Sequence, residues 1–245
     1  MVDSCAPPVV QIALPRVKPY FTYALMALTI GIYLLQLGGQ YLLGVDLVTY
    51  YGFKVNDFIR QGEIWRLITP VFLHGSLLHI GFNMYALFLF GRGLESRYGH
   101  GRFLLLYFLA GFAGNVFSFL FTPANSLGAS TAVFGLLSAE AVFLLQNRKM
   151  LGPQANRSLM NLFYMAAINL FLGFTVSAVD NFGHIGGLLG GLLFAWAGGP
   201  RWQVEQGFGS YRLSDEREGH GALTGTLIVL VVFVPLAIMG WIWPR

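Results

Sequence analysis

Charged residues are scarce in this chain of 245 residues. Asp, Glu, Lys and Arg make up only 11% of it, against roughly 25% in soluble domains, and hydrophobic residues make up 56%. The mean hydropathy is +0.62. This shortage of charge excludes an ordinary soluble domain and indicates a protein that crosses a membrane several times. The net charge of +4 follows membrane topology in its placement, so no nucleic-acid partner is expected.

Cysteine is almost absent as well. Cys5 is the one cysteine in the sequence, so an internal disulfide is excluded and the redox compartment is left open. Internal repeats and low-complexity tracts are also missing. The first apolar run follows Arg16 and Lys18, but it is too long for the core of a signal peptide and lacks a convincing cleavage site. We therefore expect it to remain as a membrane span.

What the sequence does contain is a series of long apolar runs. A helix needs about 20 apolar residues to cross the hydrocarbon core of a bilayer. Seven runs approach or exceed this length, and the fourth and sixth are short. The runs are Tyr20–Leu43, Val71–Gly91, Phe103–Phe121, Ser130–Gln146, Leu159–Val179, Phe182–Ala197 and Leu223–Trp243. The predicted fold class is therefore all-α, a polytopic membrane helix bundle.

The basic residues predict the orientation of this bundle in the cell membrane. With seven spans, eleven Lys and Arg residues fall in connecting segments on one side and four on the other. Because cytoplasmic loops are enriched in Lys and Arg, we expect a cytoplasmic N-terminus and an external C-terminus. The expected division is a cytoplasmic segment at 1–19, a core at 20–198, a cytoplasmic linker at 199–222 and a last span at 223–245. The external segment Gly44–Thr69 mixes aromatic and charged residues and predicts an interfacial layer.

Four polar residues interrupt the apolar runs, namely Ser130, His79, Asn83 and His184. Such side chains are costly in hydrocarbon, so together they predict a functional site. Ser130 opens a run of 17 residues, which covers about 25 Å of a core about 30 Å thick. We therefore expect Ser130 at a recessed helix N-terminus, where backbone N–H groups can stabilise an oxyanion.

His184 opens a glycine-rich run. Gly183, Gly187 and Gly191 recur at every fourth residue, which gives a flat helix face suited to close packing. Packing against the small residues that follow Ser130 would bring hydroxyl and imidazole within about 3 Å. Ser130 is then a candidate nucleophile and His184 its base. A helix-capping serine and an incidental histidine in a packing helix are the simpler interpretations.

His79 and Asn83 are four residues apart and so share one helix face, from which both can donate hydrogen bonds to a developing negative charge. A zinc site at His74, His79 and His184 is an alternative. However, His74 and His79 would lie about 140° apart around a helix, and no His-Glu-x-x-His motif is present. No metal and no other cofactor is expected.

No carboxylate is well placed to complete a triad. Glu140 lies about 15 Å deeper than Ser130 by helical rise, near the cytoplasmic end, where forming an ion pair or snorkelling is the simpler role. Asp180 is placed to cap the sixth span. We therefore favour a Ser–His dyad. Phe134, one turn below Ser130, is suited to packing against an imidazole ring.

Taken in order, these motifs resemble the rhomboid family of intramembrane serine proteases over about Tyr20 to Gly198. The motifs are Trp65-Arg66, His74, His79-x-x-x-Asn83, Glu95-x-x-x-Gly99, Gly128-Ala129-Ser130 and His184-x-x-Gly187-x-x-x-Gly191. The chain departs from the family pattern at two positions. Thr131 stands where the family commonly has glycine, and Phe134 stands where it often has tyrosine.

The resemblance implies a six-helix core, with the seventh span similar to the extra C-terminal helix of some members. It implies a dyad of Ser130 and His184, and an oxyanion site formed by the Ser130 N–H with His79 and Asn83. It also implies cleavage of single-pass membrane proteins near the external face, without a cofactor. The oligomeric state is left open.

Two other functions were weighed against the protease. The first is a catalytically silent rhomboid-like protein that binds or chaperones membrane clients. Such proteins usually lack the serine or the histidine, and this chain has both Ser130 and His184. The second is a transporter, which the sequence does not favour because it shows no paired, similarly interrupted helices.

Overall fold

A computed structural model of the chain describes residues 17–176, 179–207 and 210–243. Most of the predicted segment 1–19, with Cys5 and Arg16, lies outside the described residues. So do Ser177 and Ala178, at the end of the fifth predicted span.

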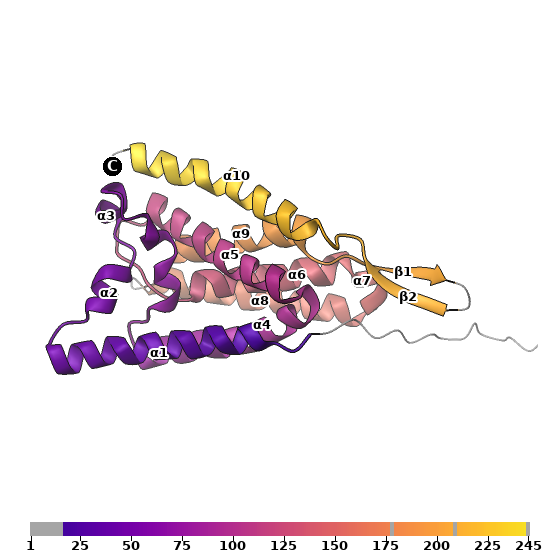
Figure 1. Ribbon diagram of the computed structural model, residues 1–245, viewed down its shortest axis with the longest axis horizontal. Helices are drawn as coiled ribbons and strands as arrows, with labels where there is room; N and C mark the ends of the chain where they lie inside the picture. Colours follow the sequence, from indigo (N-terminus) through magenta and orange to yellow (C-terminus); the bar gives the residue numbers. More distant parts are fainter. Residues whose placement is uncertain (1–16, 177–178, 208–209, 244–245) are drawn as a thin grey trace, which may run out of the picture.

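Seven long helices in the described chain run back and forth along one axis (Figure 1). They are α1 (Tyr20–Leu43), α4 (Leu77–Tyr98), α5 (His100–Phe121), α6 (Ser130–Gln146), α8 (Gln154–Thr175), α9 (Asn181–Gly198) and α10 (Gly221–Ile242). Five of them, α1, α4, α5, α8 and α10, are long and apolar enough to cross a membrane, and α6 is apolar but shorter. The predicted all-α bundle, six core helices followed by a seventh, is confirmed.

Shorter elements connect the long helices. They are α2 (Leu47–Gly52), α3 (Asn56–Arg60), η1 (Ile64–Leu67), η2 (Thr69–Phe72), α7 (Arg148–Leu151), β1 (Trp202–Gly207) and β2 (Ser210–Asp215). The two strands pair antiparallel, from Trp202 opposite Asp215 to Gly207 opposite Ser210. They lie inside the stretch that was predicted as a simple linker. In Figure 1, α2 and α3 lie at one end of the bundle and the hairpin at the other.

The second predicted span is displaced in the structure. The sequence predicted Val71–Gly91, whereas α4 begins at Leu77 and continues to Tyr98. Pro70 lies in the separate turn η2, and the Ser76 side chain then caps α4 by accepting a hydrogen bond from the His79 N–H at 3.2 Å. The helix therefore starts about two turns later than hydropathy alone indicated.

The charged end of α4 is stabilised by a buried carboxylate. Glu95 is fully buried and accepts hydrogen bonds from the Phe21 N–H at 2.9 Å and the Thr22 N–H at 2.7 Å. These N–H groups belong to the first turn of α1, where they have no partner within the helix. His100 also contacts Glu95, with Nδ1 at 2.7 Å from Oε1. Glu95 thereby fixes the N-terminus of α1 against α4.

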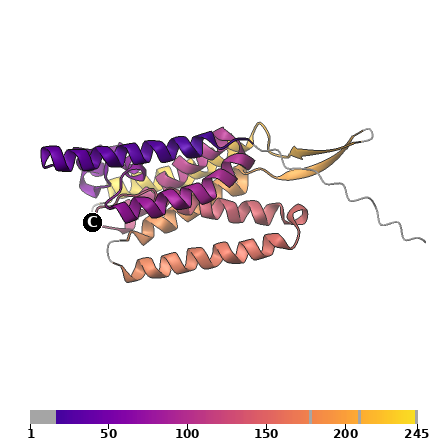
Figure 2. The same cartoon turned by 90° about the horizontal axis from the view of Figure 1, so that it is seen from below.

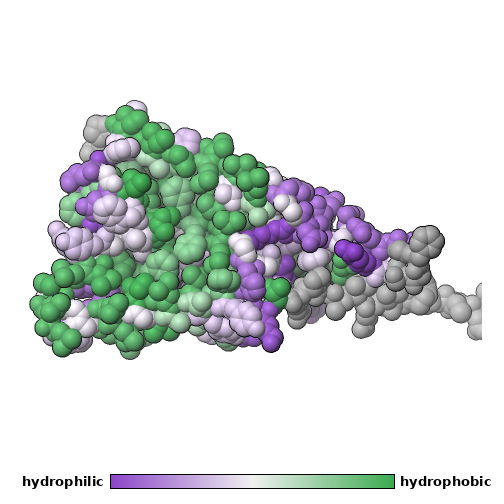
Figure 3. Space-filling model, viewed as in Figure 1, coloured by the Kyte–Doolittle hydropathy of each residue, from purple (hydrophilic) through white to green (hydrophobic). Residues whose placement is uncertain are grey.

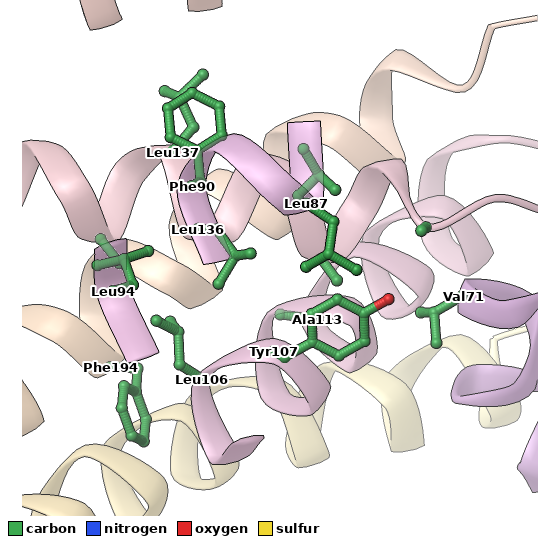
Figure 4. Packing of buried hydrophobic residues seen from close by; sticks show 14 of the residues in the cluster. Val71, Leu87, Phe90, Leu94, Leu106, Tyr107, Ala113, Leu136, Leu137 and Phe194 are labelled. Atoms are coloured by element: carbon green, nitrogen blue, oxygen red, sulfur yellow. The ribbon is translucent and has the colours of Figure 1, made fainter. Parts of the chain in front are cut away.

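The core lies between α4, α5, α6 and α9. Its fully buried side chains include Leu87, Leu94, Leu106, Tyr107, Ala113, Leu136 and Phe194, which interdigitate between these helices (Figure 4). α9 packs most extensively against α5 and α6, and α10 packs on α9 and α5. α8 borders the bundle along one side (Figure 2), and only 11% of its most apolar stretch is buried.

The surface separates by hydropathy. Hydrophobic residues cover the long helices over most of the face in Figure 3, whereas hydrophilic residues gather toward the end that carries the hairpin. An apolar belt bounded by polar ends is the arrangement expected of a bundle that crosses a bilayer.

The glycines of α9 permit the tight packing that the sequence predicted. A Cβ atom at Gly187 would lie 2.0 Å from the Thr131 carbonyl oxygen, and one at Gly191 would lie 2.2 Å from that of Gly135. Only glycine fits at such distances. The close approach of α6 and α9 therefore depends on these residues, and it places the first turns of the two helices side by side.

Candidate active site

Ser130 and His184 meet where α6 and α9 begin. Ser130 is the first residue of α6, and His184 lies in the first turn of α9. The Ser130 Oγ and His184 Nε2 atoms are 2.9 Å apart, a hydrogen-bond distance, and His184 is only 8% exposed. The structure therefore brings together the two residues that the sequence paired, although 54 positions separate them in the chain.

The imidazole of His184 is held by a neighbouring aromatic ring. The Phe134 ring stacks on it with centroids 4.2 Å apart and an angle of 12° between the ring planes, as the sequence predicted. The backbone N–H of His184 bonds to the Asp180 carbonyl at 3.1 Å, within the first turn of α9. Within the described residues, no side chain or carbonyl bonds to Nδ1. With its proton on Nδ1, the neutral imidazole presents Nε2 as an acceptor for the Ser130 hydroxyl proton.

A glycine turns the chain into α6. Gly128 has a φ of +135°, a conformation that side-chain-bearing residues rarely adopt, and its N–H bonds to the Pro70 carbonyl at 2.9 Å. A Cβ atom at this position would also lie 2.7 Å from the His79 Nε2 atom. Gly128 is thus needed both for its backbone angle and for the space it leaves between His79 and Ser130.

His79 is oriented toward this turn. Its Nδ1 accepts a hydrogen bond from the Gly75 N–H at 3.5 Å, so the neutral ring carries its proton on Nε2, the atom near Gly128. The ring of His74 contacts it at a centroid distance of 5.0 Å. His74 Nε2 in turn accepts from the Ala129 N–H at 3.3 Å. The two histidines thus lie against the backbone of Gly128 and Ala129, immediately before Ser130.

Asn83 lies one turn further along α4, on the same face as His79, and is 6% exposed. Its Nδ2 donates to the carbonyl oxygen of His79 at 2.9 Å. An amide nitrogen carries two hydrogens, so one remains for another acceptor. The described contacts thus place His79 at the start of α6 and keep Asn83 bonded to its own helix.

The carboxylates have structural partners. Asp180 accepts from the Gly183 N–H at 3.0 Å, which caps α9 as predicted, and also from the hydroxyls of Ser118 and Thr122. Burial alone would raise the pKa of Asp180, but these hydrogen bonds and the charge of Lys54 lower it below 3.8.

Glu140, the deeper acid, forms an ion pair with Arg97, which is one of the two roles expected from the sequence. Across the described ranges, no three His, Cys, Asp or Glu side chains are grouped as metal ligands would be.

Thr131, which replaces the usual glycine, lies between α5 and α9. A Cβ atom at Gly114 of α5 would lie 2.5 Å from the Thr131 Cβ, and one at Gly183 of α9 would lie 3.2 Å from its Cγ2. Thr131 is 5% exposed. Its branched side chain therefore fills space that glycines on two neighbouring helices leave open, and the start of α6 is not crowded.

The segment between α1 and α4 folds into a compact layer at the same end. Arg66 is 1% exposed and donates to the carbonyls of Tyr50 at 3.0 Å and Phe53 at 2.8 Å. Its Nε also bonds to Glu63 at 2.6 Å. Trp65 donates to the Tyr51 carbonyl at 3.1 Å. The Trp-Arg pair therefore fastens this layer internally.

Lys54 is a residue of this layer that the sequence did not single out. It is fully buried, and its Nζ donates to the carbonyls of Ala124 at 2.8 Å, Thr122 at 2.9 Å and Ser118 at 3.3 Å. Burial lowers its pKa to about 8, although the negative charge of Asp180 acts to raise it. Lys54 thereby fastens the C-terminus of α5 and the loop that leads to Ser130. The only sequence signal for this role was the presence of a single lysine among aromatic residues in the segment Gly44–Thr69.

Comparisons with known proteins identify relatives of this chain. Residues 61–201, more than half of the chain, match the Rhomboid domain. The chain is 46% identical over 181 residues to the Rhomboid protease GluP of Bacillus subtilis strain 168, a match covering 74% of this chain and 35% of GluP. It is 36% identical over 171 residues to the RHOMBOID-like protein 1 of Arabidopsis thaliana, covering 69% of this chain and 42% of that protein.

A third relative is closer in length. The rhomboid relative YdcA of Bacillus subtilis is 34% identical over 153 residues, a match covering 62% of this chain and 73% of YdcA. By contrast, the chain spans between about a third and a half of the other two. With its five apolar helices, the chain is a multi-pass membrane protein. From the domain match and these relatives, the chain belongs to the rhomboid family.

Proposed function

We propose that this protein is a serine-type intramembrane endopeptidase in which Ser130 is the nucleophile and His184 the base. The observation that carries the proposal is the 2.9 Å distance between Ser130 Oγ and His184 Nε2, with the imidazole stacked on Phe134. A positioned base is what activates a serine hydroxyl, which is otherwise a weak nucleophile at neutral pH.

The proposed reaction has two halves. Ser130 Oγ attacks the carbonyl carbon of the scissile peptide bond while His184 Nε2 takes the hydroxyl proton. The tetrahedral intermediate collapses when His184 returns that proton to the leaving amine, and an acyl-enzyme remains. Water then attacks the ester, His184 takes its proton, and the Ser130 hydroxyl is restored when the acid leaves.

The oxyanion is stabilised at the start of α6. The Ser130 N–H is in the first turn, whose N–H groups have no acceptor within the helix. The Nε2 hydrogen of His79 lies beside Gly128, and the second amide hydrogen of Asn83 is available one turn away. Donors positioned in this way are worth most when charge develops in a site with little water.

The proposed orientation places this site toward the outside. The layer between α1 and α4 lies at the same end of the bundle as the start of α6. The hairpin lies at the other end, beside basic residues that include Arg148, Lys149 and Arg201. Under the positive-inside rule, the hairpin end faces the cytoplasm. Single-pass membrane proteins would then be cleaved near the external surface.

Labelling with a fluorophosphonate probe tests the proposal. The purified full chain should react at Ser130, and Ser130→Ala and His184→Ala proteins should not label. A matched control is Ser138→Ala, which removes a hydroxyl bonded to its own helix at Gly135. Absence of labelling in a folded wild-type protein would favour the silent client-binding function instead.

A further inference from the structure

A groove lies at the end of the bundle opposite to Ser130. It has a volume of about 610 Å³ and is bordered by the end of α6, α7, the end of α9 and the base of the hairpin. α6 separates it from the dyad by its full length of 17 residues. Neither the dyad nor the oxyanion donors take part in this groove, so the proposed proteolysis does not account for it.

The groove carries an excess of positive charge. Four basic side chains line it, against one carboxylate, Glu216; the basic residues are Arg148, Lys149, Arg201 and Arg217. Glu216 is already paired with Arg201, with Nε and Oε2 3.1 Å apart. In the part of the chain that the structure describes, Arg148 and Lys149 have no carboxylate partner.

The other nearby groups offset only part of this charge. The Arg217 guanidinium donates to Gln146 Oε1 and to the Gly199 carbonyl, both at 3.0 Å and both uncharged acceptors. Asp215 is bonded to Arg102 on α5 rather than to a groove residue's side chain. Burial lowers the pKa of Arg217 and the neighbouring charge of Arg201 lowers it further, whereas the charges of Asp215 and Glu216 raise it in part. Like charges are held together here, a situation that a bound anion would relieve.

Apolar surface borders the charged groove. Leu145 is 40% exposed, Met150 38% and Trp196 53%, and all three line its edge. Trp202 lines it as well. Indole rings favour the boundary between headgroups and acyl chains, where one part of the ring is apolar and the N–H is polar. A free inorganic anion would make no use of these apolar residues, whereas the acyl chains of a lipid could pack against them.

Basic residues at this end of the bundle have a second explanation, since they also favour the proposed orientation in the membrane. That explanation applies equally to Arg157 and Arg212, which are exposed at the same end and do not line the groove. Unlike Arg157 and Arg212, the basic residues of the groove are clustered beside an apolar edge.

We propose that this groove binds the phosphate-bearing headgroup of an anionic phospholipid from the leaflet at the hairpin end. Arg148 and Lys149 contact the phosphate oxygens, and Trp196 with Met150 covers the start of the acyl chains. Basic pockets at cytoplasmic helix ends are suited to such headgroups, and each basic residue near the membrane surface adds to the attraction.

Lipid titration of the detergent-purified full chain tests this site. Phosphatidylglycerol should raise the thermal midpoint in a saturable manner, because a ligand of the folded state stabilises it. Phosphatidylcholine at equal concentration should not. The double variant Arg148→Gln/Lys149→Gln changes only exposed side chains, and it should bind phosphatidylglycerol on the order of tenfold or more weakly.

The control is Arg157→Gln/Arg212→Gln, which removes the same charge from the same end of the protein. It should retain the wild-type affinity. Equally weakened binding of phosphatidylglycerol in both double variants would contradict a specific site in the groove and indicate diffuse electrostatic attraction to the protein surface. A full stabilising effect from inorganic phosphate alone would overturn the lipid assignment. Wild-type affinity in the Arg148→Gln/Lys149→Gln protein would overturn the site itself.

Discussion

Individual side chains at the start of α6 and α9 have separable tasks in this account. Ser130 and His184 are the proposed reacting pair, Phe134 sets the plane of the imidazole, and His79 lies beside the site of the developing charge. The sequence singled out Ser130, His184 and His79 because a polar residue in an apolar run is costly and therefore conspicuous, and Phe134 because it lies one turn below Ser130. Substitutions should distinguish these tasks by which kinetic constant they change.

Phe134→Ala should lower kcat by roughly 10- to 100-fold, since a ring displaced by about 1 Å loses its alignment with Ser130 Oγ. Phe134→Tyr keeps the stacked ring and should remain close to wild type. Steady-state cleavage of a transmembrane substrate in detergent measures both. A Phe134→Ala enzyme with unchanged kcat would show that the stacked ring has no part in positioning His184.

His79→Ala and Asn83→Ala should each lower kcat by about 10²–10³, because each removes a donor to the proposed oxyanion. The KM should change less, since these donors act mainly when charge develops. If either change raised KM and left kcat intact, that residue would have a role in substrate positioning rather than in oxyanion stabilisation.

At the scale of elements, the limits of sequence reasoning follow from where the determinants lie. The bounds of α1 and α6 agree with prediction because local signals mark them, such as Gly44 with its φ of +72° after α1. The start of α4 was misplaced because η2 and the Ser76 cap interrupt a continuous apolar run. The hairpin was missed because its polar, glycine-rich sequence indicated a linker.

Lys54 was missed for another reason. Its structural role comes from hydrogen bonds to three carbonyl oxygens that are 64 to 70 positions away in the chain. Pairings of this kind depend on how α5 ends against the external layer, which no local pattern encodes. Asp180 was identified as a cap from its position before α9, but its bonds to Ser118 and Thr122 needed the structure.

Gly187→Ala tests the packing of α9 on α6. The added Cβ would lie 2.0 Å from the Thr131 carbonyl oxygen, so the helices must separate, and the expected destabilisation is about 1–3 kcal/mol or more. Gly31→Ala in α1 is the matched control, because a Cβ there meets nothing within 4 Å. Thermal unfolding should show a lower midpoint for Gly187→Ala only. Equal midpoints for both variants would contradict the tight α6–α9 contact.

At the scale of the whole molecule, buried polar contacts join the layer between α1 and α4 to the helix ends that carry the dyad. Lys54 bonds to the end of α5, and Asp180 joins that end to the start of α9. The opposite end carries the basic groove and the hairpin. The apolar belt lies between them (Figure 3). Proteolysis and lipid binding are thus proposed at opposite ends of one bundle.

The pH dependence of stability should report on Lys54. Its pKa is about 8 in the folded protein and 10.5 in its ordinary state. Between these values the unfolded chain binds a proton that the folded chain does not, so this residue makes stability rise with pH from about 8 to 10.5. Lys54→Met lacks this contribution. The thermal midpoint of the wild type, relative to that of the variant, should therefore rise between about pH 8 and pH 10.5. A constant difference between the two midpoints over this range would contradict the lowered pKa.

Cleavage of a transmembrane substrate by Ser130→Ala, His184→Ala and the double variant tests the central claim most directly. Each single change should abolish detectable cleavage while leaving the thermal midpoint near wild type, and the double variant should be no worse than either, because the pair acts as a unit. Undiminished cleavage by purified Ser130→Ala protein would contradict the assignment of Ser130 as the nucleophile and, with it, the proposed mechanism.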